Sequence, residues 1–376
     1  MKNAQILSFL FAVAVCTGCD KTDNQQDRQP DVYVAGVEID HEQKKSFAVV
    51  WKNGKAQNLG EGEAYSVYVH GNDVYAAGWG LNAQGNQVAK LWKNGIGKEL
   101  TKGVDKGNPY NYYSVSFFEL RTSLHYYERD DIDRAAWPCD YASSVFVSGT
   151  DVYVALNEGA EAKIWKNEKV ETLPNGNRAT CVSVSGNDVY VAGSSESGIT
   201  IATVWKNGKV YQTLTDKSNP DKWGRKDAIA KSIFVSGNDV YAIDLSVHNG
   251  RIWKNGVILY SLGDESNFAN AKSIFVFGND VYVCGREGIT PKLWINGNQQ
   301  TLSLETNYGV ANSVYVSDKD VYVVGMEGEA FITQFENWDW AIVTQAWAKL
   351  WVNNVGKTLI SEKTRIIPYS VFVVEK

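Results

Sequence analysis

The sequence predicts an all-β fold: a seven-bladed β-propeller of four-stranded antiparallel blades, closed by pairing of the C-terminal strand with the N-terminal blade. A motif close to S-V-x-V-S-G-N-D-V-Y-V-A-G recurs, and after a variable gap A-x-L-W-K-N-G follows it. Most copies lie about 40 residues apart, the period of a four-stranded propeller blade. The aspartate of the first half is Asp31, Asp73, Asp151, Asp188, Asp239, Asp280 and Asp320. The tryptophan of the second half is Trp51, Trp92, Trp165, Trp205, Trp253, Trp294 and Trp351.

The N-terminal residues read as a targeting signal and not as part of the fold. A short cationic start precedes an apolar run from Ala4 to Val15, which is too short to span a bilayer as a helix. Small residues follow, and then Cys19. We expect residues 1–18 to be a lipoprotein signal peptide, cleaved before a lipidated Cys19. An ordinary secretory signal is the alternative.

Residues 19–30 are expected to form a disordered tether, because Asp20 to Pro30 contains no apolar residue and cannot bury surface. Acidic residues directly after Cys19 resemble the surface-export signal of lipoproteins from Bacteroides-like bacteria. The sequence therefore predicts an outer-membrane lipoprotein of the bacterial cell envelope, on either side of that membrane, that touches the bilayer through its lipid anchor only.

Composition and charge agree with a secreted globular chain. The formal net charge of −6 argues against a nucleic-acid partner, because such binding depends on neutralised phosphates. The 20 Tyr and 13 Trp, together with many valines, suit β-strands. We expect residues 31–376 to be one monomeric propeller domain.

Each repeat divides into four short strands joined by tight turns. Gly71-Asn72-Asp73 is typical of the turn between the first two strands, and Asn94-Gly95 is typical of a two-residue hairpin between the last two. Stacked blades would bury both faces of each sheet, so we expect the recurrent tryptophans to pack between blades. A sugar-binding aromatic ladder is the alternative. We expect each recurrent aspartate to accept backbone hydrogen bonds in its turn, with a calcium ring as the alternative.

Closure of the ring is predicted by the two ends of the repeat region. The chain enters it with a second-strand motif, Asp31 to Gly36, and finishes with a first-strand motif, Ser370 to Val374. Pairing of these two segments would complete the first blade. An eighth blade is the alternative, because Asp73 and Asp151 lie almost two periods apart.

Three insertions interrupt the repeat, at 103–142, 216–230 and 327–347. All belong to connections that emerge on one face of an up-and-down propeller, so we expect one plain face and one decorated face. Long loops on a rigid scaffold commonly carry binding residues. Aromatic side chains in or beside these loops are the candidate ligand-binding residues: Trp79, Tyr110, Tyr112, Tyr113, Tyr126, Tyr127, Trp137, Trp223, Trp338 and Trp340.

The function predicted from these features is a non-catalytic binding module for a glycan or for an envelope or extracellular protein. The same aromatics could instead pack on one another as small loop cores. A glycan-active enzyme, a polysaccharide lyase or a glycosidase, is a second hypothesis, since paired carboxylates can act on glycosidic bonds. Its candidate acids are Glu119, Glu128, Asp131 and Asp133. A structural subunit of an envelope complex is the third.

The sequence lacks the motifs that are typical of zinc sites, nucleophilic hydrolases and phosphate-binding loops. The four histidines are scattered without zinc-ligand spacing, and neither a nucleophile elbow nor a phosphate-binding loop occurs. We therefore predict no catalytic residue, no metal and no cofactor. Cys139, Cys181 and Cys284 could form at most one disulfide, and buried free thiols are the simpler expectation.

The repeated DVYVAG…AxLWKNG motif behind a lipoprotein signal resembles uncharacterised repeat lipoproteins of Bacteroides-like bacteria. The resemblance covers about residues 31–376 and implies a β-propeller remotely similar to Kelch and galactose-oxidase propellers. The sialidase box, the WD40 signature and the ligands of a galactose-oxidase copper site are missing. The resemblance therefore implies the fold without those activities.

Overall fold

The protein is built from β-strands. The computed structural model describes residues 29–40, 42–43, 45–103, 139–196, 199–214, 228–246, 250–263, 269–318, 320–335, 338–359 and 365–376. All secondary-structure elements in these ranges are strands, which confirms the predicted all-β class. Among these residues no helix has the length and apolarity to cross a membrane.

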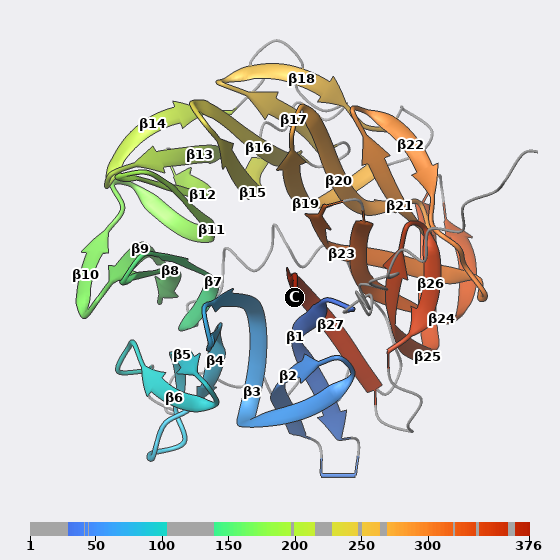
Figure 1. Cartoon of the computed structure of the whole chain (residues 1–376), viewed down its shortest axis with the longest axis horizontal. Helices are drawn as coiled ribbons and strands as arrows, with labels where there is room; N and C mark the ends of the chain where they lie inside the picture. The colour runs from blue at the N-terminus through green and yellow to red at the C-terminus, as the bar shows by residue number, and fades with distance from the viewer. Residues whose placement is uncertain are drawn as a thin grey trace, which may run out of the picture.

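The described strands form five four-stranded antiparallel sheets and one seven-stranded sheet. The larger sheet depends on β3 (Lys55–His70), a 16-residue strand that pairs with β2 through its first part and with β4 through its second. It therefore consists of two four-stranded units that share β3. The resulting seven units follow one another around a common centre (Figure 1).

Each unit runs from an inner first strand to an outer fourth strand (Figure 1). The first strands are β27 (Arg365–Val374), the second part of β3, β7 (Tyr141–Ser148), β11 (Gly176–Ser185), β15 (Ala228–Ser236), β19 (Ala269–Phe277) and β23 (Tyr308–Ser317). The second strands are β1 (Asp31–Asp40), β4 (Asp73–Leu81), β8 (Asp151–Glu158), β12 (Asp188–Glu196), β16 (Asp239–Ser246), β20 (Asp280–Glu287) and β24 (Asp320–Phe335).

The outer half of each unit comes from its third and fourth strands. The third strands are β2 (Lys45–Lys52), β5 (Gln87–Lys93), β9 (Glu161–Lys166), β13 (Thr200–Lys206), β17 (Gly250–Lys254), β21 (Thr290–Ile295) and β25 (Trp338–Val352). The fourth strands are the first part of β3, β6 (Ile96–Glu99), β10 (Lys169–Thr172), β14 (Lys209–Thr213), β18 (Val257–Ser261), β22 (Asn298–Thr301) and β26 (Val355–Thr358). Units are numbered one to seven in the order of these lists.

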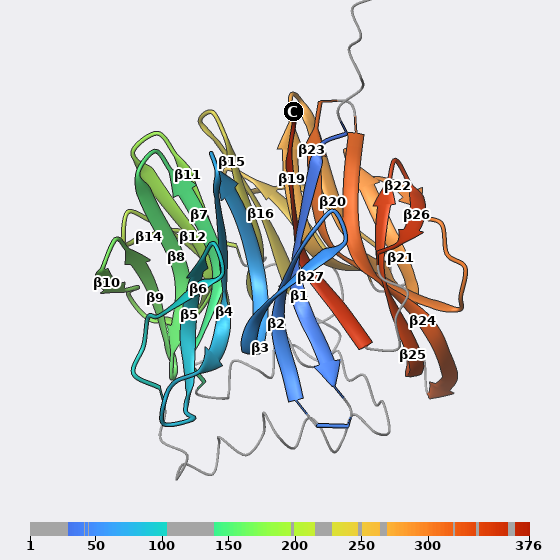
Figure 2. The ribbon, with the colours of Figure 1, turned by 60° about the horizontal axis from the view of Figure 1, so that its bottom comes forward.

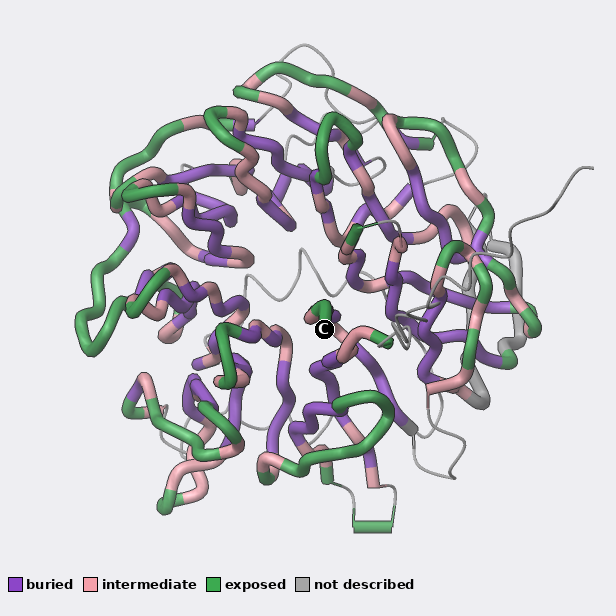
Figure 3. The backbone as a smooth tube through the Cα atoms, viewed as in Figure 1, coloured by how far each residue is buried: buried purple, intermediate pink, exposed green. Residues whose placement is uncertain are grey.

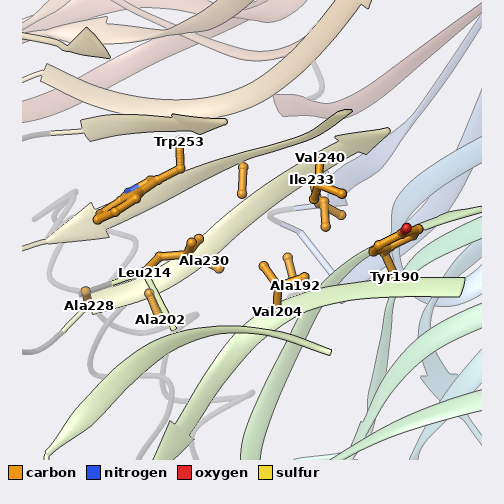
Figure 4. Close-up of a cluster of buried hydrophobic side chains, with 11 residues drawn as sticks. Tyr190, Ala192, Ala202, Val204, Leu214, Ala228, Ala230, Ile233, Val240 and Trp253 are labelled. Carbon is orange, nitrogen blue, oxygen red and sulfur yellow. The ribbon is translucent and has the colours of Figure 1, made fainter. Parts of the chain in front are cut away.

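The hydrophobic core lies between neighbouring units. The recurrent tryptophans are at most 6% exposed, and each packs in a cluster with residues of the preceding unit. Figure 4 shows one cluster, in which Trp253 of unit five lies over Leu214 and Ala202 of unit four. Exposed residues collect on the outermost strands (Figure 3). The expectation that these tryptophans pack between sheets is therefore confirmed.

A serine on six of the seven first strands links neighbouring units by hydrogen bonds. For example, the backbone N–H of Val145 in unit three donates to Ser66 Oγ of unit two at 3.2 Å. Six interfaces carry this bond, with Ser66, Ser144, Ser232, Ser273, Ser313 and Ser370 as acceptors. At the remaining interface, between units four and five, Cys181 takes the serine position and its Sγ lies 3.8 Å from Ile233 O.

The C-terminal strand pairs with the first strand of the described chain, as expected from the sequence. β27 lies antiparallel to β1, with Val374 opposite Asp31 and Val371 opposite Val34. Unit one in turn packs on unit seven, where Trp51 shares a cluster with Tyr322 and other residues of that unit. Contacts between neighbouring units therefore continue across the join between the two ends of the repeat region.

The turns between first and second strands meet the hairpins between third and fourth strands on one face, which we call the turn face. In unit two, Asn94 Nδ2 donates to Asp73 Oδ1 at 2.7 Å, and Asn94 Oδ1 accepts the backbone N–H of Val74 at 2.8 Å. All seven units repeat this pair of bonds. The expectation that the recurrent aspartates accept backbone hydrogen bonds is wrong: their carboxylates accept hydrogen bonds from side chains, and the asparagine accepts the bond from the backbone.

The described residues that flank the insertions lie at the opposite end of the strands. Most of 103–142 and of 216–230 falls outside the described residues, and so does the region that would hold an eighth blade. The backbone of 327–347 extends β24 and β25 as a hairpin, with Phe335 opposite Trp338. This hairpin reaches away from the end where β27 finishes (Figure 2). At its base, the buried side chains of Lys349 and Glu327 form an ion pair.

Candidate functional site

The inner strands share a β-bulge on the insertion side of the molecule. In unit two, Ala64 lies opposite Gly78 and Ser66 opposite Ala77, so that Tyr65 is the extra residue of the bulge. The bulged residues of the seven units are Tyr369, Tyr65, Ser143, Thr180, Lys231, Lys272 and Asn312. Because a bulge re-aims the side chain that it carries, this position is suited to function.

The glycine of the DVYVAG motif accommodates the bulge. A Cβ atom at Gly78 would lie 1.9 Å from the carbonyl oxygen of Glu63 on the bulged strand, and Gly193, Gly285 and Gly325 show the same conflict with their partner strands. Units three and five carry Leu156 and Asp244 at this position instead. The repeated glycine is thus explained by a close approach of two backbones.

Three bulged side chains connect neighbouring units. Ser143 Oγ donates to Ala179 O at 2.9 Å, and Thr180 Oγ1 donates to Ala230 O at 2.6 Å. Asn312 Nδ2 donates to Pro368 O at 2.8 Å. In each case the acceptor is a backbone carbonyl of the next unit's bulge. The other four units carry longer side chains at this position, two tyrosines and two lysines.

The two bulged tyrosines belong to a tyrosine cluster, formed by Glu63, Tyr65, Tyr141, Arg178 and Tyr369. The Tyr65 ring lies edge-on to the rings of Tyr369 and Tyr141, with centroids 5.3 and 5.9 Å apart. Tyr369 donates its hydroxyl hydrogen to Glu63 Oε2 at 3.0 Å, and Arg178 Nε donates to Tyr141 Oη at 3.1 Å. The four contributing strands, β27, β3, β7 and β11, are successive inner strands (Figure 1).

Burial and charge distinguish this cluster from an ordinary core. Glu63 and Arg178 are only 8% and 7% exposed, whereas the three tyrosines are half-buried. Charged side chains are rarely buried to this extent without hydrogen-bond partners. The cluster therefore presents aromatic edges and hydroxyls that buried charged groups hold in place.

Both ends of the first insertion are fixed beside the tyrosine cluster. Asp140 is 1% exposed and directly precedes Tyr141. Its carboxylate accepts hydrogen bonds from the Gly159 backbone, at 2.9 Å, from the Thr101 side chain and from the Gly103 backbone. Burial raises the pKa of Asp140, and these hydrogen bonds oppose that rise. The carboxyl thus joins the residues before the insertion to those after it.

Further along the inner strands, an aromatic collar surrounds the centre. Its rings are Phe146, Tyr68, Phe372, Tyr315, Phe275 and Phe234, and successive centroids in this order lie 4.7–4.9 Å apart. Burial raises the pKa of Tyr315 to about 12 and also raises that of Tyr68. Unit four has Ser183 at the corresponding position, 5% exposed. The collar is mostly apolar, so the polar chemistry of the inner strands is concentrated at the bulges.

Of the candidate residues predicted from the sequence, Trp79 alone has a described side chain. It is 9% exposed and lies on β4, opposite Glu63 of the tyrosine cluster. Trp338 and Trp340 lie at the tip of the β24–β25 hairpin, and only their backbone is described. Cys19, the candidate acids and the remaining aromatics lie outside the described residues: Tyr110, Tyr112, Tyr113, Tyr126, Tyr127, Trp137, Trp223, Glu119, Glu128, Asp131 and Asp133.

Sequence reasoning missed the tyrosine cluster. The signal was present in the repeat, because the residue before the inner-strand serine is tyrosine only at Tyr65 and Tyr369. In the described part of the chain, no group of three potential ligands is arranged to hold a metal ion. Cys139, Cys181 and Cys284 are free thiols, and burial raises the pKa of the last two.

Comparisons with known proteins show likeness in fold alone. No protein-family model matches the chain, and no curated protein matches it. A puromycin-hydrolyzing peptidase of Mycobacterium tuberculosis is 10% identical with a TM-score of 0.51, over 88% of this chain. This chain spans about half, 52%, of that peptidase.

Two other solved structures are more distantly similar. A DUF4623 family protein from Bacteroides eggerthii is 11% identical, with a TM-score of 0.33 over 92% of this chain and 88% of its own. The computationally designed Ika4 protein is 16% identical, with a TM-score of 0.28 over 41% of this chain and 89% of its own.

Proposed function

We propose that the seven units form a seven-bladed β-propeller. Three observations support the proposal. A hydrophobic cluster fills each junction between neighbouring units, including that between seven and one. The serine position of each inner strand contacts the next unit all the way around. β27 pairs with β1, which joins the two ends of the repeat region. A propeller removes the exposed sheet faces and edges that isolated units would present.

The function that we infer is binding of a glycan by an envelope lipoprotein that does not catalyse a reaction. The observation that carries this inference is the tyrosine cluster, at the end of the inner strands to which the first insertion is attached. Tyrosine offers flat apolar surface together with a hydroxyl that can fix a ligand's orientation, and Glu63 and Arg178 hold two of these hydroxyls in place. A protein ligand, an enzymatic activity and a structural role are the alternatives.

The lipoprotein part of the proposal rests on the N-terminal sequence alone. Cys19 follows a cationic and apolar leader, and a polar segment separates it from β1. Metabolic labelling with a palmitate analogue should mark the full chain and leave a Cys19→Ser variant unlabelled. Equal labelling of the two chains would contradict lipidation at Cys19.

Binding by the tyrosine cluster can be tested on a glycan array, followed by calorimetry of the best ligand. Tyr65→Ala removes the ring that contacts both of its neighbours, and we expect affinity to fall about tenfold to a hundredfold, as for loss of a stacking aromatic group worth 1–3 kcal/mol. Ser66, the next residue, bonds the following unit, so Ser66→Ala is a matched control that should reduce stability and retain affinity.

Three outcomes would contradict the proposal. Undiminished glycan affinity in Tyr65→Ala would mean that the cluster is not the site. Capture of a protein in place of any glycan would favour a protein ligand. Turnover of a glycan that is lost in Glu128→Gln or Asp131→Asn would favour the enzyme hypothesis.

A further inference from the structure

The most exposed large apolar side chains of the described residues share one position in the repeat. Ile96, Val355 and Val257 are 79%, 71% and 69% exposed. Each is the first residue after the hairpin turn of its unit, opposite Lys93, Val352 and Lys254, respectively. They therefore stand on the rim of the turn face, in units two, seven and five. Exposed apolar groups that recur at one structural position are more informative than scattered ones.

The remaining units present either lysine or another apolar side chain on this face. Lys55, Lys169 and Lys209 occupy the same register position in units one, three and four, and all are exposed. Unit six has Asn298 there, but its inner turn carries Phe277, which is 43% exposed. Apolar side chains interspersed with lysines, whose stems are apolar and whose ammonium groups reach toward water, suit a membrane interface.

Charge on the turn face is largely compensated. The hairpin lysines of units one to five form ion pairs with the recurrent aspartates at 2.7–2.9 Å, as between Lys93 and Asp73. Lys376 at the C-terminus pairs with Asp31 at 2.8 Å. Since five of the seven recurrent carboxylates have cationic partners, the face can approach a surface of low net charge with most of its aspartates compensated.

The chain also enters the fold on the turn face. β1 begins at Asp31, in the row of turn-face aspartates, so the chain enters β1 from this side. Twelve residues reach at most about 40 Å when fully extended. A lipid on Cys19 would therefore keep the turn face near the bilayer, whereas the tyrosine cluster lies toward the other end of the inner strands.

We propose that the turn face docks on the surface of a neutral phospholipid bilayer through Ile96, Val257, Val355 and Phe277, and so directs the bulge end away from the membrane. This inference deepens the proposed lipoprotein function and rests on it for orientation. The four apolar side chains belong to the described residues, and their exposure does not depend on whether Cys19 carries a lipid.

The test uses the mature chain, residues 19–376, with Cys19→Ser so that no lipid is attached. Co-flotation with phosphatidylcholine vesicles should show weak binding. In the triple variant Ile96→Asn, Val257→Asn, Val355→Asn, the vesicle-bound fraction should fall at least about tenfold, since burial of several apolar groups is lost without any change in charge. Ile199→Asn is the matched control: Ile199 is 41% exposed and precedes β13 at the opposite end of the strands.

The outcomes separate this proposal from the binding proposal. Loss of flotation in the triple variant, with glycan affinity and Ile199→Asn unchanged, would support docking. Absence of flotation in the parent chain, equal flotation of the triple variant, or equal loss in Ile199→Asn would overturn it. Sedimentation that shows a dimer of the parent chain, dissociated by the triple substitution, would overturn it in favour of a second copy. Glycan affinity, measured on the same samples, tests the tyrosine cluster independently.

Discussion

The two ends of the inner strands differ in how closely the seven copies of the repeat agree. On the turn face, the same aspartate and asparagine make the same two hydrogen bonds in every unit. At the bulge, the backbone is the same in every unit but the side chain is not: tyrosine, serine, threonine, lysine and asparagine all occur. A shared backbone with varied side chains is what a rigid scaffold for a binding site requires.

This contrast separates stability from recognition. Substitutions in the repeated residues should change the free energy of unfolding and leave ligand affinity intact, whereas substitutions of the longer bulged side chains should do the opposite. A substitution that broke this rule would weaken the separation of stability from recognition.

The largest effect on stability is expected for a tryptophan between units. Trp351 is 0% exposed and donates from Nε1 to Ser303 O at 2.7 Å. Trp351→Ala should lower the free energy of unfolding by about 3–5 kcal/mol, because it leaves a cavity and removes this hydrogen bond. Urea unfolding measures the loss, and calorimetry should show that the folded fraction still binds glycan. Leu259→Ala, at a 37% exposed side chain, is the control and should change stability by less than about 0.5 kcal/mol.

A second effect, dependent on pH, is expected where unit five departs from the repeat. Asp244 takes the usual glycine position, is 0% exposed and accepts two hydrogen bonds from Arg251, at 2.8 and 3.1 Å. Burial raises the pKa of Asp244 to about 6, although Arg251 opposes the rise. Because the folded protein then holds this proton more tightly than the unfolded chain does, stability should fall as the pH rises from about 4 to about 6.

Asp244→Asn removes that titration. Between pH 4 and pH 7, the difference in unfolding free energy between the parent chain and the variant should change by about 3 kcal/mol, from two pH units at about 1.4 kcal/mol each, with the parent relatively more stable at pH 4. Parallel stability curves for the two chains would contradict a raised pKa of this buried carboxyl. Denaturant titrations at half-unit pH intervals provide the measurement.

The repeat predicts most of the fold because its physical causes are local. Asn94-Gly95 predicts a hairpin from two adjacent residues, and the structure has both at positive φ, 53° and 84°. The period of the tryptophans predicts burial between units, since a spacing maintained over the whole chain needs a structural reason. The C-terminal pairing follows in the same way from an unpaired strand motif at each end.

The candidate site was less predictable because its causes are not local. Glu63, Arg178 and Tyr369 come together only after four inner strands are placed side by side, and no spacing in the sequence predicts that they do. The bulge that aims Tyr65 depends on a close backbone approach at Gly78. The sequence alone shows Gly78 only as a residue within a strand. The aromatic content of the insertions predicts a site within them, whereas in the structure aromatic and charged groups converge beside the end of the first insertion, next to Tyr141.

The smallest effect is expected at a single turn-face asparagine, because one of seven equivalent turns is altered. Asn94 has φ of 53° and bonds both Asp73 and the Val74 backbone. Asn94→Ala should cost about 1–2 kcal/mol, since alanine is strained in the left-handed region and forms neither bond. Asn94→Gly keeps the backbone unstrained and loses only the bonds, so it should recover part of that cost. If both variants unfold at the parent's urea midpoint, the asparagine bonds are incidental, and the regularity of the turn face would need a cause other than stability.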